Sequence, residues 1–159
     1  MRHTRSIALP RLFSVLALFL LAVPVSANDQ VVTIESKYSV KESLDRLSAV
    51  LTTKGIRVAA RVNHAAGAKA AGLTLPPTEL LIFGNPKLGT PLMQTNRMIG
   101  LDLPMKVLAW QDATGKVHLS YTAPAVLKTR YAITDKDGIF DAMTKALSGL
   151  TAAAVAAKP

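Results

Sequence analysis

Residues 78–93 constrain the fold of this 159-residue chain more than any other stretch. An apolar run at residues 80–83 ends in a Gly-Asn-Pro turn at residues 84–86. Pro77 before the run and the glycine after it indicate a strand, and four apolar residues without alternation are typical of a central strand covered on both faces. The Asn-Pro pair then favours an extended residue followed by the first turn of a helix.

This turn has features of an anion site. Unpaired amides of residues 87–90 would point outward beside Lys87, and a helix N-terminus attracts negative charge. Asn85 and Thr90 complete this candidate site. The alternative is an ordinary turn with a solvated lysine, because Gly, Asn and Pro are common turn residues. The two glycines of the stretch have P-loop spacing, but no Lys-Ser/Thr pair follows them, which excludes a nucleotide phosphate loop.

The N-terminus predicts a secretory signal peptide at residues 1–27. Three arginines precede the apolar residues 12–23, and a proline and the small-residue site Val25-Ser26-Ala27 follow. The alternative, an uncleaved anchor, is disfavoured because the run is shorter than the roughly 20 residues that span a bilayer. We therefore expect cleavage after Ala27, no transmembrane anchor in the mature chain, and a periplasmic or secreted location.

Cleavage would leave 16 of the 19 basic residues against 10 acidic ones, a net charge of +6. Nucleic acid is not the expected partner, because the chain is predicted to be exported and has one Trp and three Tyr, too few for a stacking platform. The charge is compatible with an anionic ligand or an anionic envelope surface, but the basic residues are spread from Lys37 to Lys158 without a run, which favours solvated faces. There is no cysteine, and the two mature histidines have no metal-site spacing, so the sequence predicts no disulfide, metal or cofactor.

The pattern of the mature chain predicts one α+β domain at residues 28–150, followed by an alanine-rich tail at residues 151–159. Capping residues and apolar stripes indicate helices near residues 40–51, 64–71 and 139–150. Asp112 to Gly115 form a predicted hairpin turn. β-Branched and alternating segments indicate strands at residues 31–36, 56–63, 80–83, 105–111 and 116–121. We expect a two-layer domain, with a mainly antiparallel sheet and helices packed on one face.

The chain resembles the family called domain of unknown function 302 over residues 31–133. The segments that carry the resemblance are Asn63 to Ala68, Gly72-Leu73, Pro77 to Lys87, Gly100 to Pro104 and Ser120-Tyr121. The resemblance implies a compact α+β domain, in many members a small exported or stand-alone protein, and no established catalytic mechanism. The chain departs from the family pattern at Asn63, Thr122-Ala123 and Tyr131, where Asp, Asn-Asp and His are common.

His64 is the main candidate for chemistry, since it follows a strand edge. With Glu79 it would form a general base and its orienting partner, and Thr78 or Thr90 would then be the nucleophile of a hydrolase-like enzyme. No nucleophile-elbow motif supports that reading. Tyr121, in the family-like segment, is a further candidate ligand residue.

A binding or self-associating module is the favoured function. In one version, His64, Asn85, Lys87 and Thr90 converge on a small anionic ligand. In the other, the surface around residues 65–73 and 84–93 forms a symmetric homodimer. The reaction, the ligand and the partner do not follow from the sequence.

Overall fold

The computed structural model describes residues 30–157, so the predicted signal peptide lies outside the described residues. In chain order the elements are β1 (Val31–Ser36), α1 (Val40–Thr53), β2 (Arg57–Asn63), α2 (His64–Ala70), β3 (Thr78–Gly84), α3 (Pro86–Thr95), the 3₁₀ helix η2 (Arg97–Leu101), β4 (Met105–Gln111), β5 (Val117–Thr122), α4 (Pro124–Arg130) and α5 (Asp137–Val155).

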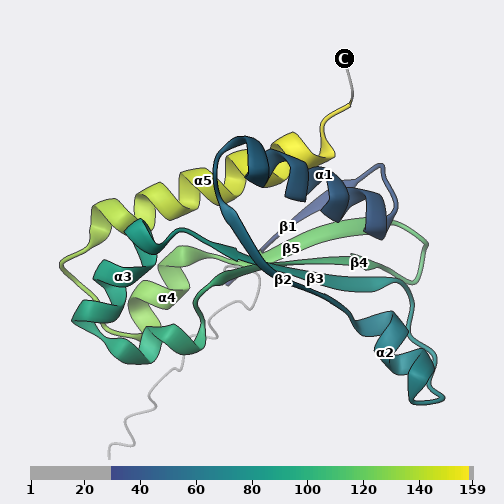
Figure 1. Ribbon diagram of the computed structural model, residues 1–159, viewed down its shortest axis with the longest axis horizontal. Helices are drawn as coiled ribbons and strands as arrows, with labels where there is room; N and C mark the ends of the chain where they lie inside the picture. Colours follow the sequence, from purple (N-terminus) through teal and green to yellow (C-terminus); the bar gives the residue numbers. More distant parts are fainter. Residues whose placement is uncertain (1–29, 158–159) are drawn as a thin grey trace, which may run out of the picture.

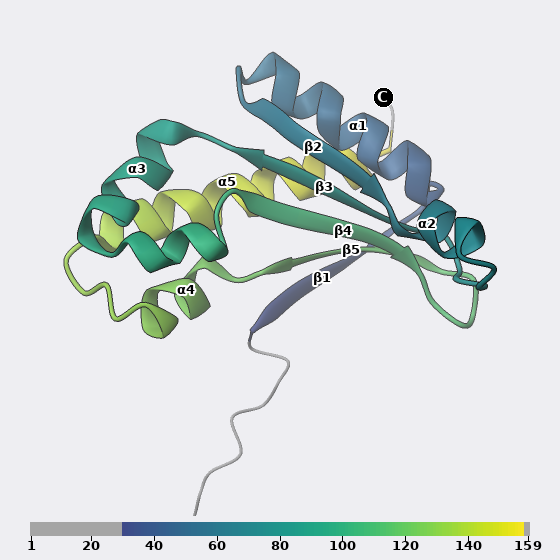
Figure 2. The ribbon, with the colours of Figure 1, turned by 60° about the horizontal axis from the view of Figure 1, so that its bottom comes forward.

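The strands form one antiparallel sheet in the order β1-β5-β4-β3-β2. Helices α1 and α5 lie over one face of it, and α3 and α4 lie beyond one end (Figure 1). Within residues 30–157 no helix lies across the opposite face (Figure 2). The predicted α+β class, with an antiparallel sheet and helices on one face, is confirmed. None of the helices in this described part has the length and apolarity that a membrane crossing requires.

The core lies between the covered sheet face and the stripes of α1 and α5. Leu44, Leu47 and Leu51 of α1 are fully buried. Leu119 of β5 is also fully buried, and Leu147 of α5 is 2% exposed. The helix starts follow the sequence: Ser39 Oγ accepts the Glu42 amide at 3.2 Å, and Asn63 Oδ1 accepts the Ala66 amide at 2.7 Å. Each cap satisfies an amide that the first helical turn leaves unpaired.

Strand β3 is an interior strand, between β4 and the edge strand β2, but the prediction that both of its faces are covered is wrong. Glu79, Leu81 and Phe83 are buried under the helices, whereas Leu80 and Ile82 are half-buried on the open face. The continuous apolar run arises because Leu80 pairs with Leu108 of β4 on that open face. Cross-strand apolar contacts of this kind stabilise a sheet even where the face is not covered by helices.

Three elements differ from the sequence-based assignment. Residues 94–102, to which the sequence-based assignment gives no helix or strand, contain the end of α3 and η2, and a further helix, α4, precedes the last one. Helix α5 runs to Val155, so the predicted boundary at residue 150 falls inside it. Thr151 and Ala154 are buried in the core, which makes the first part of the alanine-rich segment a structural part of the domain.

Candidate functional site

An apolar groove lies at the end of the sheet where β2 begins and β3 ends. Its volume is about 490 Å³, within the range of small-molecule sites. The floor is formed by Phe83 of β3 and Met105 of β4, and α5 contributes Met143 and Leu147. Helix α3 supplies the outer wall. The remaining lining residues come from the strand ends, α3 and α5: Ile56, Arg57, Ala59, Gly84, Asn85, Pro86, Leu88, Gly89, Thr90, Met93, Leu103, Pro104, Ala146 and Leu150.

The shape of the groove depends on small residues and on flexible ones. A Cβ atom built on Gly84 would lie 3.1 Å from Pro104 Cβ, so glycine allows β3 and the start of β4 to approach closely here. Gly89 leaves α3 without a side chain opposite Leu103 Cδ1. Three methionines of the lining can adjust to a ligand, because thioether side chains are unbranched and polarisable.

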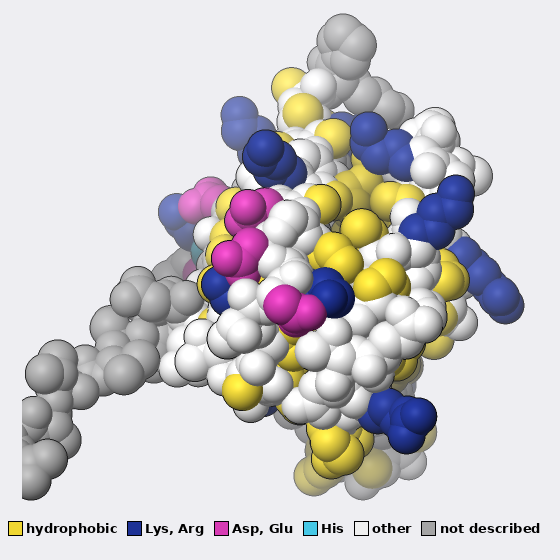
Figure 3. Space-filling view, turned by 90° about the vertical axis from the view of Figure 1, so that its left-hand side faces the viewer, with side chains coloured by type: hydrophobic (Ala, Val, Ile, Leu, Met, Phe, Trp, Pro, Cys, Tyr) yellow, Lys and Arg dark blue, Asp and Glu magenta, His cyan; other side chains and the backbone are white. Residues whose placement is uncertain are grey.

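Among the described residues, Arg57 is the only charged one that lines the groove. It is exposed at the first position of β2, two residues after Gly55, whose positive φ of 65° ends the preceding turn. No ion pair of Arg57 or of Lys87 occurs within residues 30–157. Figure 3 looks at the end of the molecule that carries α3 and shows hydrophobic side chains at the surface, bordered by Lys and Arg.

Asn85 has a different role from the predicted one. Its Oδ1 accepts the Lys87 amide at 3.0 Å, and its carbonyl oxygen accepts the amides of Leu88 and Gly89 at 3.0 and 3.1 Å. Three of the four amides that were expected to bind an anion are therefore already satisfied. Lys87 and Thr90 are exposed, and Thr90 lines the groove. The prediction of an amide cradle at this turn is wrong, although Asn85 and Thr90 do belong to a cavity.

His64 lies at the other end of the sheet. Asn63 is paired with Glu79 in the β2–β3 register and Arg57 with Gly84, so His64 and the α3 turn are separated by the length of β3, about 20 Å. His64, Asn85, Lys87 and Thr90 consequently do not converge. The segments 65–73 and 84–93 also lie at opposite ends of β3, so they do not form one continuous face (Figure 1).

Glu79 does not orient His64. Its buried carboxylate accepts Arg61 Nε at 2.7 Å and Asn63 Nδ2 at 3.2 Å. Arg61 also donates to Asp45 of α1 at 2.6 Å. The hydrogen bonds of Lys41 and then of Arg61 lower the pKa of Asp45. This charged cluster ties β2 to α1 and β3, so the predicted catalytic pair is absent from the described residues.

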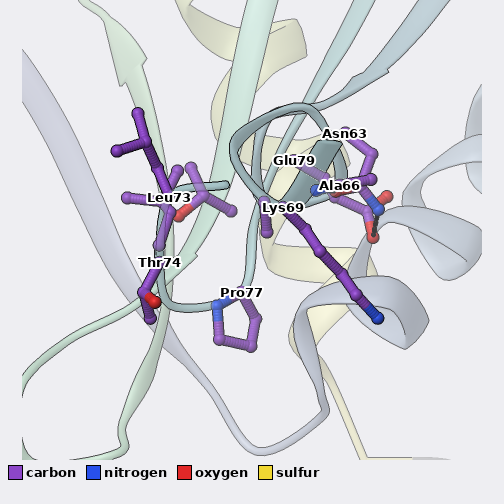
Figure 4. Close-up of a pocket in the computed structure, with 10 residues that line it drawn as sticks. Asn63, Ala66, Lys69, Leu73, Thr74, Pro77 and Glu79 are labelled. Carbon is purple, nitrogen blue, oxygen red and sulfur yellow. Dashed lines mark hydrogen bonds between the residues drawn. The ribbon is translucent and has the colours of Figure 1, made fainter. Parts of the chain in front are cut away.

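A second pocket of about 500 Å³, lined by both apolar and polar residues, lies beside this cluster, between α2 and the following loop. Figure 4 shows Leu73 and Thr74 on one side of it and Asn63, Ala66 and Glu79 on the other. The polar atoms of Asn63 and Glu79 are bonded to each other and to their neighbours. These two side chains are therefore committed to the fold, and the other polar side chains of the lining are Lys69, Thr74 and Thr78.

Two further residues from the sequence analysis are structural. Tyr121 is buried on the covered face of β5, and burial raises the pKa of its phenol. Tyr131, where the family pattern often has His, donates to Asp102 at 2.6 Å and fixes α4 beside η2. Arg57, Met93 and Met143 line the groove together, and no sequence pattern had grouped them. The one signal in the sequence was an arginine near the start of a predicted strand, two residues after a glycine.

Comparisons with known proteins agree with this fold. A crystal structure of an uncharacterised conserved protein DUF302 from Bacillus stearothermophilus superimposes with a TM-score of 0.71. The match covers 78% of this chain and 97% of that one, at 20% sequence identity. This similarity shows the shared fold.

Curated relatives carry a different name. The chain is 55% identical over 102 residues to proteins named fluoride-specific ion channel FluC 1, from Brucella suis biovar 1 (strain 1330) and from Brucella abortus biovar 1 (strain 9-941). The match covers 64% of this chain and 40% and 38% of those proteins, so the chain spans about two fifths of their length.

A family model described as "Domain of unknown function DUF302" matches residues 32–150, which include the sheet, the groove and most of α5. The chain therefore belongs to the DUF302 family.

Proposed function

We propose that this protein is a binding module, and that its groove holds a small amphipathic anion. The supporting observation is the combination of an apolar cavity of about 490 Å³ with one lining charge, the Arg57 guanidinium. An apolar ligand body would bury surface against Phe83 and the methionines, which contributes roughly 25 cal/mol per Å². A carboxylate, sulfonate or phosphate at one end of the ligand would pair with Arg57, whose planar fork matches such groups.

A small inorganic anion fits the geometry less well. Such an ion is strongly hydrated and requires several converging donors to replace its water shell. Asn85 already accepts hydrogen bonds from three amides of the α3 turn, and the lining around Arg57 is mainly apolar. The same argument applies to fluoride, the ion in the name of the Brucella relatives. An amphipathic anion uses both the charge and the apolar walls, so it is the better-supported ligand class.

The anionic dye 1-anilinonaphthalene-8-sulfonate tests this proposal, because it joins apolar rings to one sulfonate. We expect saturable binding of one dye molecule per chain, measured as the increase in dye fluorescence. Arg57→Gln should weaken binding about tenfold, the loss of one charge-assisted contact of roughly 1.5 kcal/mol. An uncharged analogue, N-phenyl-1-naphthylamine, should bind the wild type and Arg57→Gln equally.

A matched pair of substitutions on α5 locates the site. Ala146 lines the groove, so Ala146→Phe should block binding of both dyes. Ala152 is exposed on the same helix and does not line the groove, so Ala152→Phe should leave binding unchanged. Equal effects of the two substitutions, or binding of sulfate and fluoride as tight as that of the dye, would refute an amphipathic site.

We also propose export to the periplasm or the exterior through residues 1–27. Native mass spectrometry of the protein purified from its own compartment checks this together with the ligand. A polypeptide that begins at Asn28 would support export, and a mass excess would give the mass of a retained ligand. The spectrum also reports the number of subunits, which tests the alternative function, self-association as a homodimer. An intact Met1 terminus would contradict the proposed export.

A further inference from the structure

The 3₁₀ helix η2 holds two large apolar side chains in solvent. Met98 is 59% exposed and Leu101 is 73% exposed, the latter the highest value among the large hydrophobic residues of the described chain. Side chains three residues apart eclipse in a 3₁₀ helix, so Met98 and Leu101 project from the same side. We call these two residues the η2 pair. Contact with a bilayer or a partner would bury this apolar area.

The segment that carries the η2 pair is held firmly. Ile99, between the two, is fully buried in the core. Asn96 caps η2, since its Oδ1 accepts the Met98 amide at 3.0 Å, and its Nδ2 donates to the Tyr131 carbonyl oxygen at 3.0 Å. The η2 pair is therefore presented by an anchored element, rather than by a loop that could turn these side chains inward.

Basic groups accompany the η2 pair. Arg97 is exposed at the start of η2. Lys106 Nζ donates to the carbonyl oxygens of Asp102 and Pro104, so its charge is not neutralised by a carboxylate there. Arg130 pairs with Asp102 at 2.7 Å. The group thus has three cations and one carboxylate, an excess of positive charge around two protruding apolar side chains.

We propose that this end of the molecule docks on a bilayer that contains anionic phospholipid. The η2 pair would insert into the interface between headgroups and acyl chains, and Arg97, Lys106 and Arg130 would face the headgroups. Peripheral membrane binding combines these two contributions, buried apolar area and attraction to anionic lipid. A protein partner is less well supported, because the apolar part consists of two protruding side chains rather than a broad face.

The docking surface lies directly behind the groove. A Cβ on Gly100 of η2 would be 3.5 Å from Sδ of Met93, and Met93 lines the groove. Docking would therefore place the α3 wall close to the bilayer. Docking on a bilayer does not require a ligand in the groove. Loss of vesicle binding would therefore leave the dye-binding proposal intact, and loss of dye binding would leave the docking proposal intact.

Vesicle co-sedimentation tests the docking, with the full purified protein and its N-terminus defined by intact mass. We expect binding to phosphatidylglycerol vesicles and at least about tenfold weaker partition to pure phosphatidylcholine, with binding reduced by salt. The double variant Met98→Ser/Leu101→Ser should lose about fivefold or more in partition coefficient. Arg97→Gln should weaken binding to a smaller extent and lower its salt dependence.

Leu73 and Leu75 provide the matched control. They are 67% and 42% exposed, and they follow α2 at the opposite end of the molecule. Leu73→Ser/Leu75→Ser should retain wild-type partition. All four side chains are exposed, so we expect both double variants to fold, and urea unfolding checks this. Equal losses in the two variants, no loss in the η2 variant, or equal binding to both vesicle types would overturn the proposal.

Discussion

The two ends of β3 hold cavities of similar volume, and a cluster of hydrogen-bonded charged side chains borders only one of them. At the Glu79 end, the polar groups are bonded to one another, from Asp45 through Arg61 to Glu79 and Asn63. At the Phe83 end, the walls are apolar and Arg57 has no ion pair among the described residues. A satisfied cluster supports the fold, whereas an uncommitted charge beside apolar walls is available to a ligand.

Phe83→Ala is the substitution with the largest expected effect. The ring is 97% buried on the floor of the groove, and its removal should cost roughly 3 kcal/mol of unfolding free energy. This value is at the low end for Phe→Ala because an existing cavity already borders the ring. Urea unfolding measures it. A loss below about 1 kcal/mol would show that the ring contributes little to the core, and the contrast between the two ends would fail.

Glu79→Ala should cost less, about 2 kcal/mol, through lost hydrogen bonds. It removes the acceptor of Arg61 Nε and of Asn63 Nδ2, and bonds to charged groups are worth roughly 1.5–3 kcal/mol. Arg61 keeps its contact with Asp45, and its side chain is 29% exposed, which limits the loss. Dye binding in the groove should be unchanged. A variant with wild-type stability and lost dye binding would assign Glu79 to a ligand site instead.

The difference between the two ends also explains what could be predicted from the sequence. Local signals worked: Ser39 and Asn63 were recognised as helix caps, and the β4–β5 hairpin closes through Asp112 to Gly115 as expected. The fold class followed from the same patterns. These features depend on residues within a few positions of one another.

The groove could not be predicted, because its parts are distant in the chain. Arg57, Met93 and Met143 come together through the packing of α3 and α5 at the sheet end, and no local pattern encodes that contact. The Asn85 turn misled for a related reason. Its composition fits both an anion site and a helix cap whose amides are bonded within the turn. Only the structure shows that Asn85 accepts the amides of residues 87–89.

One substitution type, Gly→Ala, should have opposite signs at the two ends. At the groove end, a Cβ on Gly84 would lie 3.1 Å from Pro104 Cβ, so Gly84→Ala should cost about 1 kcal/mol through overpacking. In α2, a Cβ on Gly67 would meet no atom within 4 Å, and Ala is the better helix former. Gly67→Ala should therefore stabilise by roughly 0.5–1 kcal/mol. Effects of the same sign in urea unfolding would contradict the close approach at the groove.

The smallest expected effect is the contribution of Asp45, at the Glu79 end, to the pH dependence of stability. The hydrogen bonds of Lys41, then of Arg61, hold the pKa of Asp45 below its ordinary value of 3.8. A carboxyl with a depressed pKa in the folded state contributes stability above its unfolded pKa, and this is lost as the pH falls through the folded value. Asp45→Asn should therefore be less stable than the wild type at pH 7, and the difference should shrink below pH 3.8.

Unfolding by urea at pH 7, 4 and 3 measures this convergence. Asp141→Asn is the control, since Asp141 is exposed on α5 and has no ion pair within residues 30–157. It should show no comparable change with pH. Arg57→Gln should also keep a constant difference from the wild type, because Arg57 has no carboxylate partner there. A pH-dependent loss in Arg57→Gln would mean that the groove arginine is tied into the fold, and its availability to a ligand would be disproved.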